Sequence, residues 1–136
     1  MEEVVIIGAG ASGLACGIEL GRRGISCLIL EGKEKAGKKI YASGNGKCNL
    51  ANRNISADKY HSMGVSGYEQ IRSVVPETAA ASVEQFFHEI GIPFTERNGY
   101  LYPHSEQAGA VVHAMEETVT GLGGHIKCNT YVTSVE

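Results

Sequence analysis

VVIIGAGASG, residues 4–13, joins a short β-branched apolar run to a glycine-rich turn. The run over residues 4–7 is apolar throughout, which is typical of a strand buried on both faces in a parallel sheet. Residues 12–23 favour a helix, and a second buried strand is predicted over residues 25–30. This order of strand, helix and strand predicts a βαβ unit over residues 3–31.

The same stretch contains a GxGxxG pattern, whose three glycines have separate tasks. Gly8 permits the tight turn, Gly10 lets the backbone approach a pyrophosphate, and Gly13 lets the helix lie close to the sheet. Backbone N–H groups at the start of the helix, with the positive end of its dipole, favour phosphate oxygens. Glu31, at the end of the second strand, is expected to accept hydrogen bonds from both ribose hydroxyls of an adenosine. Together these features predict dinucleotide binding.

The residues after Glu31 favour FAD over NAD, although both cofactors present the same ADP half to this unit. In a plain NAD-type fold a further helix and a third strand follow soon. Residues 32–56 are instead rich in Gly, Lys, Asn and Ser and contain few apolar side chains. We expect a long irregular cofactor loop there, because such segments in compact domains are usually functional or disordered. A loop of this kind suits a cofactor whose flavin end is held by other segments.

Helix and hairpin signals follow this segment. Apolar side chains at helical spacing over residues 83–90 predict a helix. Asn98-Gly99 separates residues 94–97 from residues 100–102 and predicts a β-hairpin, because a type I′ turn needs positive φ at both central positions.

The last third of the chain predicts a helix and two strands. Residues 108–122 carry a second apolar helical face, for which Ser105 is the expected N-cap. Strands are predicted over residues 126–128 and 131–135. The expected fold is α/β: a truncated, Rossmann-like FAD-binding domain with a parallel sheet, a β-hairpin and added helices. We expect residues 1–136 to be the amino-terminal part of one FAD/NAD(P)-binding domain, with the βαβ unit at 3–31, the cofactor loop at 32–56, helices and hairpin at 57–123 and returning strands at 124–136.

Composition limits the partners of the chain. Its net charge of −3, from 12 Lys and Arg against 15 Asp and Glu, gives no general reason to bind nucleic acid. No stretch approaches the roughly 18 consecutive apolar residues of a membrane span. We expect a small-molecule substrate, with neither nucleic acid nor a membrane as partner, and an acidic start at residues 1–3 favours the cytoplasm over secretion. The four cysteines and five histidines match no metal-binding spacing, so we predict no metal and assign no catalytic residue.

Two later motifs resemble the signature of one bacterial flavoprotein family. Residues 37–52 carry G-K-K-I, then S-G-N-G-K-C-N and a final Asn, and residues 99–108 carry G-Y-L-Y-P-H-S-E-Q-A. The family patterns are G-[RK]-K, S-G-G/N-G-[RK]-C-N-x-T-N and G-x-x-[FY]-P-x-S-x-x-A. This chain departs at Ala51, where the family often has Thr. The family is that of aminoacetone-oxidase-type FAD-binding enzymes, also described as the bile-acid-inducible flavoprotein N type.

The resemblance implies a considerably longer flavoprotein with two dinucleotide-binding folds, of which this chain looks like the amino-terminal part. It implies that Ser12 approaches the pyrophosphate, that Lys38 and Lys39 approach the phosphates or the ribityl chain, and that Val132 meets the adenine through its backbone. Glycines such as Gly44 allow backbone N–H groups to form an anion-binding concavity. The predicted cofactor-binding residues are Gly8, Gly10, Ala11, Ser12, Gly13, Glu31, Gly32, Lys38, Lys39, Ser43, Gly44, Asn45, Gly46 and Val132.

The function implied by the resemblance is FAD-dependent hydride transfer between NAD(P)H and a small or steroid-like organic substrate in the full-length protein. Two alternatives stay open. The chain could be a non-catalytic folded fragment, inactive alone, that binds ADP-like ligands or forms a homodimer through an unpaired sheet edge. It could also be an NAD-only dinucleotide-binding domain. For Cys48, packing beneath a tight loop is favoured over a redox role beside the flavin, because no second cysteine is near in sequence.

Overall fold

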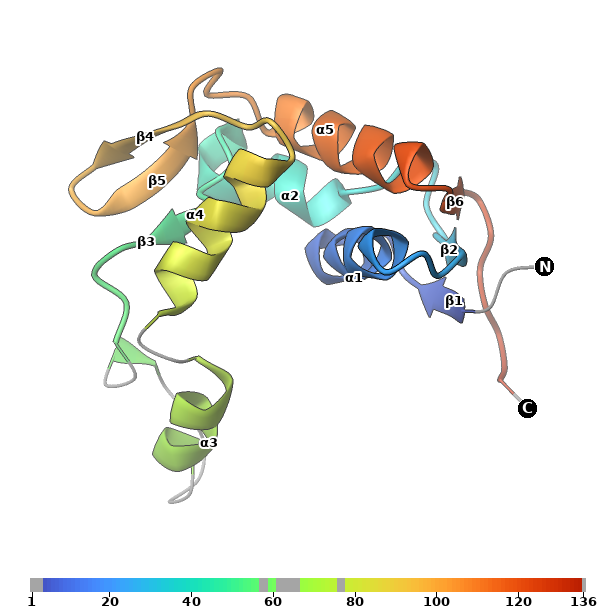
Figure 1. The fold of residues 1–136 in the computed structure, drawn as a ribbon, viewed down its shortest axis with the longest axis horizontal. Coiled ribbons are helices and arrows are strands. Elements are labelled where there is room, and N and C mark those ends of the chain that lie inside the picture. The colour runs from blue at the N-terminus through green and yellow to red at the C-terminus, as the bar shows by residue number, and fades with distance from the viewer. Residues whose placement is uncertain (1–3, 57–58, 61–66, 76–77, 136) are drawn as a thin grey trace. The chain divides into compact units, whose positions relative to one another are not determined.

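A computed structural model of the protein describes residues 4–56, 59–60, 67–75 and 78–135 (Figure 1). The chain divides into two compact units. Unit 1 comprises Met1–Cys48 and Ser105–Glu136, and unit 2 comprises Asn49–His104. Residue 3, where the predicted βαβ unit begins, lies outside the described residues, as do the acidic residues 1 and 2 and parts of the predicted segment 57–123.

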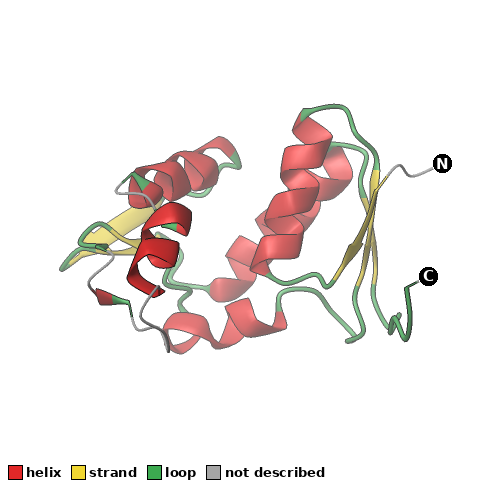
Figure 2. Ribbon diagram, turned by 90° about the horizontal axis from the view of Figure 1, so that it is seen from below, coloured by secondary structure: helices red, strands yellow, loops and turns green. Residues whose placement is uncertain are grey.

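Unit 1 is built around a parallel sheet. Its strands are β1 (Val4–Ile7), β2 (Cys27–Leu30) and β6 (His125–Lys127), in the order β1-β2-β6. Two helices, α1 (Ala11–Arg22) and α5 (Ala108–Gly121), lie on one face of this sheet (Figure 2). The predicted α/β class with a parallel sheet is therefore confirmed.

The core of unit 1 lies between the sheet and these two helices. Leu14 and Ile18 of α1, Ile29 of β2 and Val119 of α5 are fully buried. Burial of one such side chain contributes roughly 1.5–3 kcal/mol. The opposite face of β1 presents Val5 and Ile7, which are 56% and 59% exposed. The strand predicted to be buried on both faces is thus half-buried on one face and exposed on the other among the described residues.

The segment after β2 is more regular than predicted. It contains the short helix α2 (Lys38–Ala42) and the 3₁₀ turn η1 (Ser43–Gly46), so the expectation of an irregular loop throughout 32–56 is wrong. Gly37 precedes α2 with φ +69°, and a Cβ there would lie 2.8 Å from the Val112 Cγ1. The helix can therefore sit directly against α5, with Ile40 buried between them.

Unit 2 has an antiparallel sheet of order β3-β5-β4. Its strands are β3 (Ala51–Asn52), β4 (Phe94–Arg97) and β5 (Tyr100–Pro103), and its helices are α3 (Gly67–Val74) and α4 (Ala79–Glu89). The predicted hairpin is confirmed: β4 pairs with β5, and Asn98 and Gly99 at the turn have φ of +54° and +86°. The predicted helix over 83–90 corresponds to α4.

Four local predictions are wrong. Helix α5 is capped by Gln107 and not by Ser105, whose hydroxyl instead accepts a 3.3 Å hydrogen bond from the Gln107 N–H. The last sheet strand covers His125–Lys127, one residue earlier than predicted. Residues 131–135 form no strand, because no neighbouring strand of the described chain pairs with them. The second strand also begins at Cys27, two residues later than predicted.

No helix among the described residues is long and apolar enough to cross a membrane.

Candidate functional site

A groove of about 720 Å³ lies in unit 1 where the strands β1 and β2 end. The turn after β1, the first residues of α1 and the start of α2 complete its walls. The lining residues are Ile6, Ile7, Gly8, Ala9, Gly10, Ser12, Gly13, Cys16, Glu31, Lys33, Lys38 and Lys39. Ligands of open α/β sheets bind at this place, beyond the carboxyl ends of the strands.

The glycines of the turn have the geometry that their predicted tasks require. Gly8 has φ +99°, and its N–H donates a 2.7 Å hydrogen bond to the Leu30 carbonyl. A Cβ at Gly13 would overlap the Gly8 carbonyl oxygen, so glycine there lets α1 lie against the end of β1. Gly17, one turn later, plays a similar part, because its Cβ would lie 2.8 Å from Ile29 Cδ1.

Gly10 differs from Gly13 because its surroundings are open. It is the N-cap of α1, with ordinary φ of −80° and no side-chain hydrogen bond capping the helix. A Cβ at this position would meet no atom within 4 Å. The first amides of a helix have no partner inside that helix, and they carry the positive end of its dipole. Space and donors for an anion therefore occur together at the start of α1.

Glu31 is held in place by the backbone around it. One carboxylate oxygen accepts a 2.8 Å hydrogen bond from the Ala9 N–H, and the other accepts a 2.9 Å hydrogen bond from the Lys33 N–H. The hydrogen bond from Lys33 and then that from Ala9 hold the pKa of the carboxyl below its usual value. Glu31 is thus ionised and oriented before any ligand binds. A carboxylate offers about four acceptor sites, so both oxygens can still accept ribose hydroxyls.

Three lysines give the groove a positive character. Lys33, Lys38 and Lys39 line it, and Glu31 supplies the one carboxylate among the described lining residues. Their side chains are exposed, so their charge acts through solvent and favours a diphosphate without fixing its position. Sequence reasoning missed five lining residues, namely Ile6, Ile7, Ala9, Cys16 and Lys33. The position of Lys33, two residues after the strand-end carboxylate, was the available signal for the lysine.

The structure brings some of the predicted residues together and leaves others apart. Ala11 is exposed at the start of α1 but is not among the described residues that line the groove. Gly32 lines a neighbouring cavity of about 350 Å³ in unit 1, with Lys33, Glu34, Lys35 and Lys38. A Cβ at Gly32 would lie 2.9 Å from the Tyr131 ring, and the Thr130 N–H donates to the Glu31 carbonyl. The chain before Val132 therefore runs beside Glu31, although Val132 lies in no strand.

Residues 43–46 form a separate turn in unit 1. Gly44, Asn45 and Gly46 have φ between +54° and +81°, a left-handed run that glycine permits. None of these four residues is among the described residues that line the groove. Lys47 beside this turn forms a 2.7 Å ion pair with Glu106, which precedes α5. The predicted cofactor contacts of this turn remain predictions.

Cys48 packs beneath the same turn. Its side chain is buried, its N–H donates to the Ser43 carbonyl, and burial raises the pKa of the thiol. A thiol held protonated is a weak nucleophile, so this geometry favours packing over redox chemistry. Within the described ranges, no three His, Cys, Asp or Glu side chains gather as metal ligands would.

Comparison with known families identifies the family of this chain. Residues 2–136 match the family described as the HI0933-like protein Rossmann domain. The chain belongs to the HI0933-like Rossmann domain family. The resemblance to a bacterial FAD-binding family, inferred above from the motifs at 37–52 and 99–108, is thereby confirmed, and the chain is a Rossmann domain.

Two curated relatives are similar to this member of the HI0933-like family. The 3-dehydro-bile acid delta(4,6)-reductase of Clostridium scindens is 39% identical over 118 residues, which cover 85% of this chain and 28% of the reductase. The ribosomal RNA dihydrouridine synthase of Haemophilus influenzae is 30% identical over 135 residues, which cover 98% of this chain and 33% of the synthase. The chain thus spans about a third or less of the length of the relatives it matches.

Solved structures show the same fold. The chain is similar to the 3-ketosteroid-delta4-(5alpha)-dehydrogenase of Rhodococcus jostii, with a TM-score of 0.66 and 17% identity over 93% of this chain and 37% of that one. It is also similar to THI4 of Thermovibrio ammonificans, with a TM-score of 0.62 and 18% identity over 93% of this chain and 38% of that one.

Proposed function

We propose that the groove of unit 1 holds the ADP half of FAD and that the full-length protein is a flavin-dependent reductase of carbon–carbon double bonds. The observation that carries the first part is the joint placement of Glu31 and Gly10. An ionised, oriented carboxylate lies beside a helix start that is open to an approaching anion. Ribose hydroxyls and a diphosphate, linked as in ADP, need these two environments side by side.

In this pose the chain binds and orients the nucleotide. The carboxylate of Glu31 accepts from the ribose hydroxyls, and the amides at the start of α1 donate to the diphosphate. Ser12 and the lysines Lys38 and Lys39 line the same groove and supply a hydroxyl and two positive charges. When bound, FAD supplies hydride transfer, for which NAD(P)H is the proposed reductant.

The reaction class is supported by what the two curated relatives share. One is named for reduction of a bile acid at its delta(4,6) unsaturation, and the other makes dihydrouridine, a uridine with one ring double bond reduced. Addition of a hydride to one carbon of an electron-poor double bond and of a proton to the other achieves such a reduction. We infer the same step for the full-length protein, with a steroid-like acid as the first candidate substrate.

A second candidate substrate is a uracil base in RNA. The match to the ribosomal RNA dihydrouridine synthase covers 98% of the chain and is the observation in its favour. This substrate would overturn the expectation, drawn from the net charge, that nucleic acid is not a partner.

Two measurements test the proposal. Titration of the chain with FAD and with ADP should show binding that weakens by roughly tenfold or more in Glu31→Gln, because a charged hydrogen bond to ribose is lost. Glu34→Gln, an exposed change three residues away, is the matched control. Equal affinity of Glu31→Gln and the parent chain would remove Glu31 from the site. Tight binding of NAD without binding of FAD would favour the NAD-only alternative.

The substrate is tested with full-length protein and NAD(P)H. A bile acid with a conjugated 3-oxo-4,6-diene and unmodified ribosomal RNA are supplied in separate reactions, and mass spectrometry follows the gain of two hydrogens in each. Reduction of the steroid alone supports the first candidate, and reduction of the RNA alone supports the second. A colourless full-length protein that reduces neither after incubation with FAD would support the non-catalytic alternative.

A further inference from the structure

A second cavity, of about 350 Å³, lies wholly within unit 2. It is formed by the segment around β3, the residues that follow this segment, and the first turns of α4. The side chains of Asn49, Lys59 and Tyr60 line it, together with apolar residues described below. Its volume is at the lower end of the range of small-molecule sites. Neither the family membership nor the proposed use of the groove in unit 1 accounts for it.

One wall of this cavity is apolar. The segment around β3 contributes Leu50, Ala51 and Ile55. Helix α4 contributes Ala79, Ala80 and Val83. Ala80 is 8% exposed and belongs to the packed interior of the unit. The small alanine side chains at the start of α4 leave the space that larger residues would fill. This wall suits the hydrocarbon body of a ligand.

The rest of the lining is rich in hydrogen-bond donors and carries a positive charge. The ammonium of Lys59 donates a 2.6 Å hydrogen bond to the Asn54 carbonyl, which leaves two of its three N–H groups for other acceptors. Among the described residues that line the cavity, none is acidic. The amide of Asn49 and the phenol of Tyr60 add further donors. The cavity therefore favours a ligand with acceptor atoms and one negative charge.

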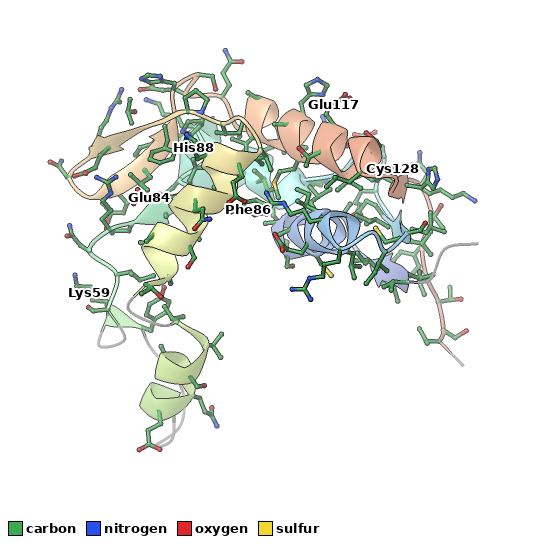
Figure 3. All side chains as sticks on the ribbon, viewed as in Figure 1. Lys59, Glu84, Phe86, His88, Glu117 and Cys128 are labelled. Carbon is green, nitrogen blue, oxygen red and sulfur yellow. The ribbon has the colours of Figure 1, made fainter. Side chains whose placement is uncertain are left out.

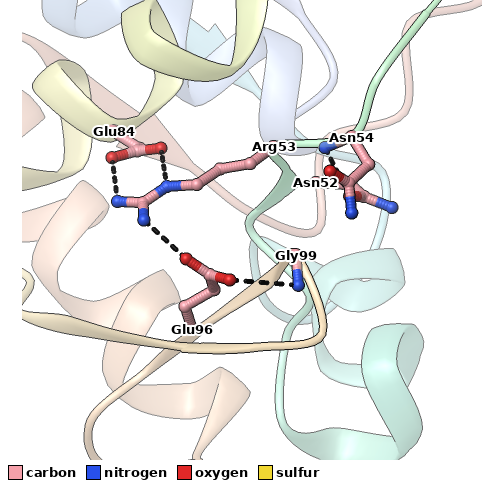
Figure 4. A network of polar contacts seen from close by, with 6 residues as sticks. All are labelled: Asn52, Arg53, Asn54, Glu84, Glu96 and Gly99. Atoms are coloured by element: carbon pink, nitrogen blue, oxygen red, sulfur yellow. Dashed lines mark hydrogen bonds and ion pairs between the residues drawn. The ribbon is translucent and has the colours of Figure 1, made fainter.

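An ion-pair network holds the walls of the cavity together (Figure 4). The Arg53 guanidinium donates two 2.7 Å hydrogen bonds to Glu84 of α4 and one of 2.6 Å to Glu96 of β4. The Arg53 N–H also donates to the Gly99 carbonyl at the hairpin turn. The bidentate contact between Arg53 and Glu84 holds the segment around β3 against α4, and both of these segments contribute to the apolar wall. Figure 3 shows Lys59 on the segment that follows β3 and Glu84 on α4.

We propose that this cavity binds a monocarboxylic acid with a compact apolar body. The carboxylate meets the Lys59 ammonium and neighbouring donors, and the apolar body lies against Leu50 and Val83. A phosphate monoester fits less well, because it carries close to two negative charges at neutral pH, and the described residues of the lining offer one cation beside a hydrocarbon wall. This inference does not rest on FAD binding, since all its residues belong to unit 2.

The test is an NMR titration of the amide spectrum of the chain, without FAD, using cyclohexanecarboxylate, cyclohexanecarboxamide and inorganic phosphate. The carboxylate should shift amide signals of residues 49–55 and 79–83 in a saturable manner. The uncharged amide should bind about tenfold more weakly, because the charged hydrogen bond is lost. Equal binding of carboxylate and amide, saturable binding of phosphate in preference to both, or shifts confined to other residues would overturn the proposal.

Variants separate the ligand contact from the fold. Lys59→Met should weaken carboxylate binding about tenfold and leave amide binding unchanged, whereas Lys59→Arg should retain carboxylate binding. Ala79→Phe should fill the cavity and abolish both. The matched control is Lys127→Met, which removes the same charge from an exposed position on β6. Amide signals that stay unshifted away from the substituted residue show that each variant is folded. Full carboxylate affinity in folded Lys59→Met would overturn the proposal.

Discussion

The two units use glycine and side chains in opposite ways to build their candidate sites. In unit 1 the glycines Gly8 and Gly10 leave open space in the groove, because a Cβ at either would meet no atom within 4 Å. In unit 2 the cavity is made by side chains, and the Arg53 network holds its walls. The shape of a glycine turn depends on the few residues that form it. The shape of a cavity lined by side chains depends on which distant segments pack together.

This difference extends to the sheets. In unit 1 the strands β1 and β2, which border the groove, are joined by one helix, so their pairing follows from the order of neighbouring elements, whereas β6 pairs with β2 from a distant part of the chain. In unit 2 the strand β3 pairs with β5, which lies about fifty residues further along the chain. The Leu50 N–H donates to the Leu101 carbonyl, and the Arg53 N–H donates to the Gly99 carbonyl. The two family motifs at 37–52 and 99–108, separate in sequence, therefore meet in one antiparallel sheet.

Gly13→Ala should have the largest effect and should be confined to unit 1. Its Cβ would overlap the Gly8 carbonyl oxygen, which belongs to the backbone and cannot move without displacing β1. We expect a loss of about 4 kcal/mol or more in unfolding free energy, the range that marks disrupted packing. Urea denaturation measures it. Hairpin amides of unit 2 should keep their spectrum, and a Gly13→Ala protein of parental stability would show that α1 does not lie against β1 as described.

Leu101→Ala tests the long-range pairing of unit 2. Leu101 is 1% exposed on β5, opposite Ala51, and its truncation should cost about 3 kcal/mol. Hydrogen exchange at the Leu50 amide, which donates to the Leu101 carbonyl, should accelerate. The control is the neighbouring Tyr100→Ala, at a side chain that is 44% exposed and should cost much less. Equal effects of the two changes would mean that β3 and β5 do not enclose a core.

The same contrast explains what the sequence could predict. Strand β1, the hairpin at Asn98 and Gly99, and the apolar face of α5 follow from periodicity or turn chemistry, which act over a few residues. Helix α2 was missed because only two of its five residues are large and apolar or aromatic, and its position is fixed by contact between Gly37 and Val112 of α5. Ser105 has the chemistry of an N-cap, but the helix starts beyond its reach.

Among the predicted site residues, those that shape the backbone of the turn after β1 do line the groove. Gly8, Gly10 and Gly13 line the groove, and so does Glu31 at the strand end. Lys33 was missed because an exposed lysine carries no periodic or steric signal. The segment at 131–135 has β-branched residues but pairs with no described strand, since strand formation depends on a neighbour that local sequence does not specify.

Gly10→Ala should separate binding from stability in unit 1. A Cβ at Gly10 meets no atom of the chain within 4 Å and φ is ordinary, so the unfolding free energy should fall by about 1 kcal/mol or less, the cost of alanine in place of glycine at an N-cap. The same methyl group would project into the space proposed for the pyrophosphate, and affinity for ADP should fall by roughly tenfold or more. Calorimetric titration and thermal unfolding measure the two effects. Unchanged ADP affinity in the folded variant would show that the diphosphate does not bind at the start of α1.

The smallest expected effect is the pH dependence contributed by Glu31, which joins the glycine turn to the end of β2. Hydrogen bonds from the Lys33 and Ala9 amides lower its pKa below the ordinary value of 4.5, so folding is favoured by the ionised form. The stabilisation is complete above pH 4.5 and is lost as the pH falls through the lower pKa of the folded state. Between these two pKa values the unfolded chain has bound a proton at this carboxyl and the folded chain has not, so acid favours unfolding. Thermal unfolding of the parent and Glu31→Gln, compared from neutral to acidic pH, should therefore show a difference that shrinks on acidification. A difference that grows in acid would mean that the carboxyl is not held ionised by these amides, and the proposed ribose contact would lose its acceptor.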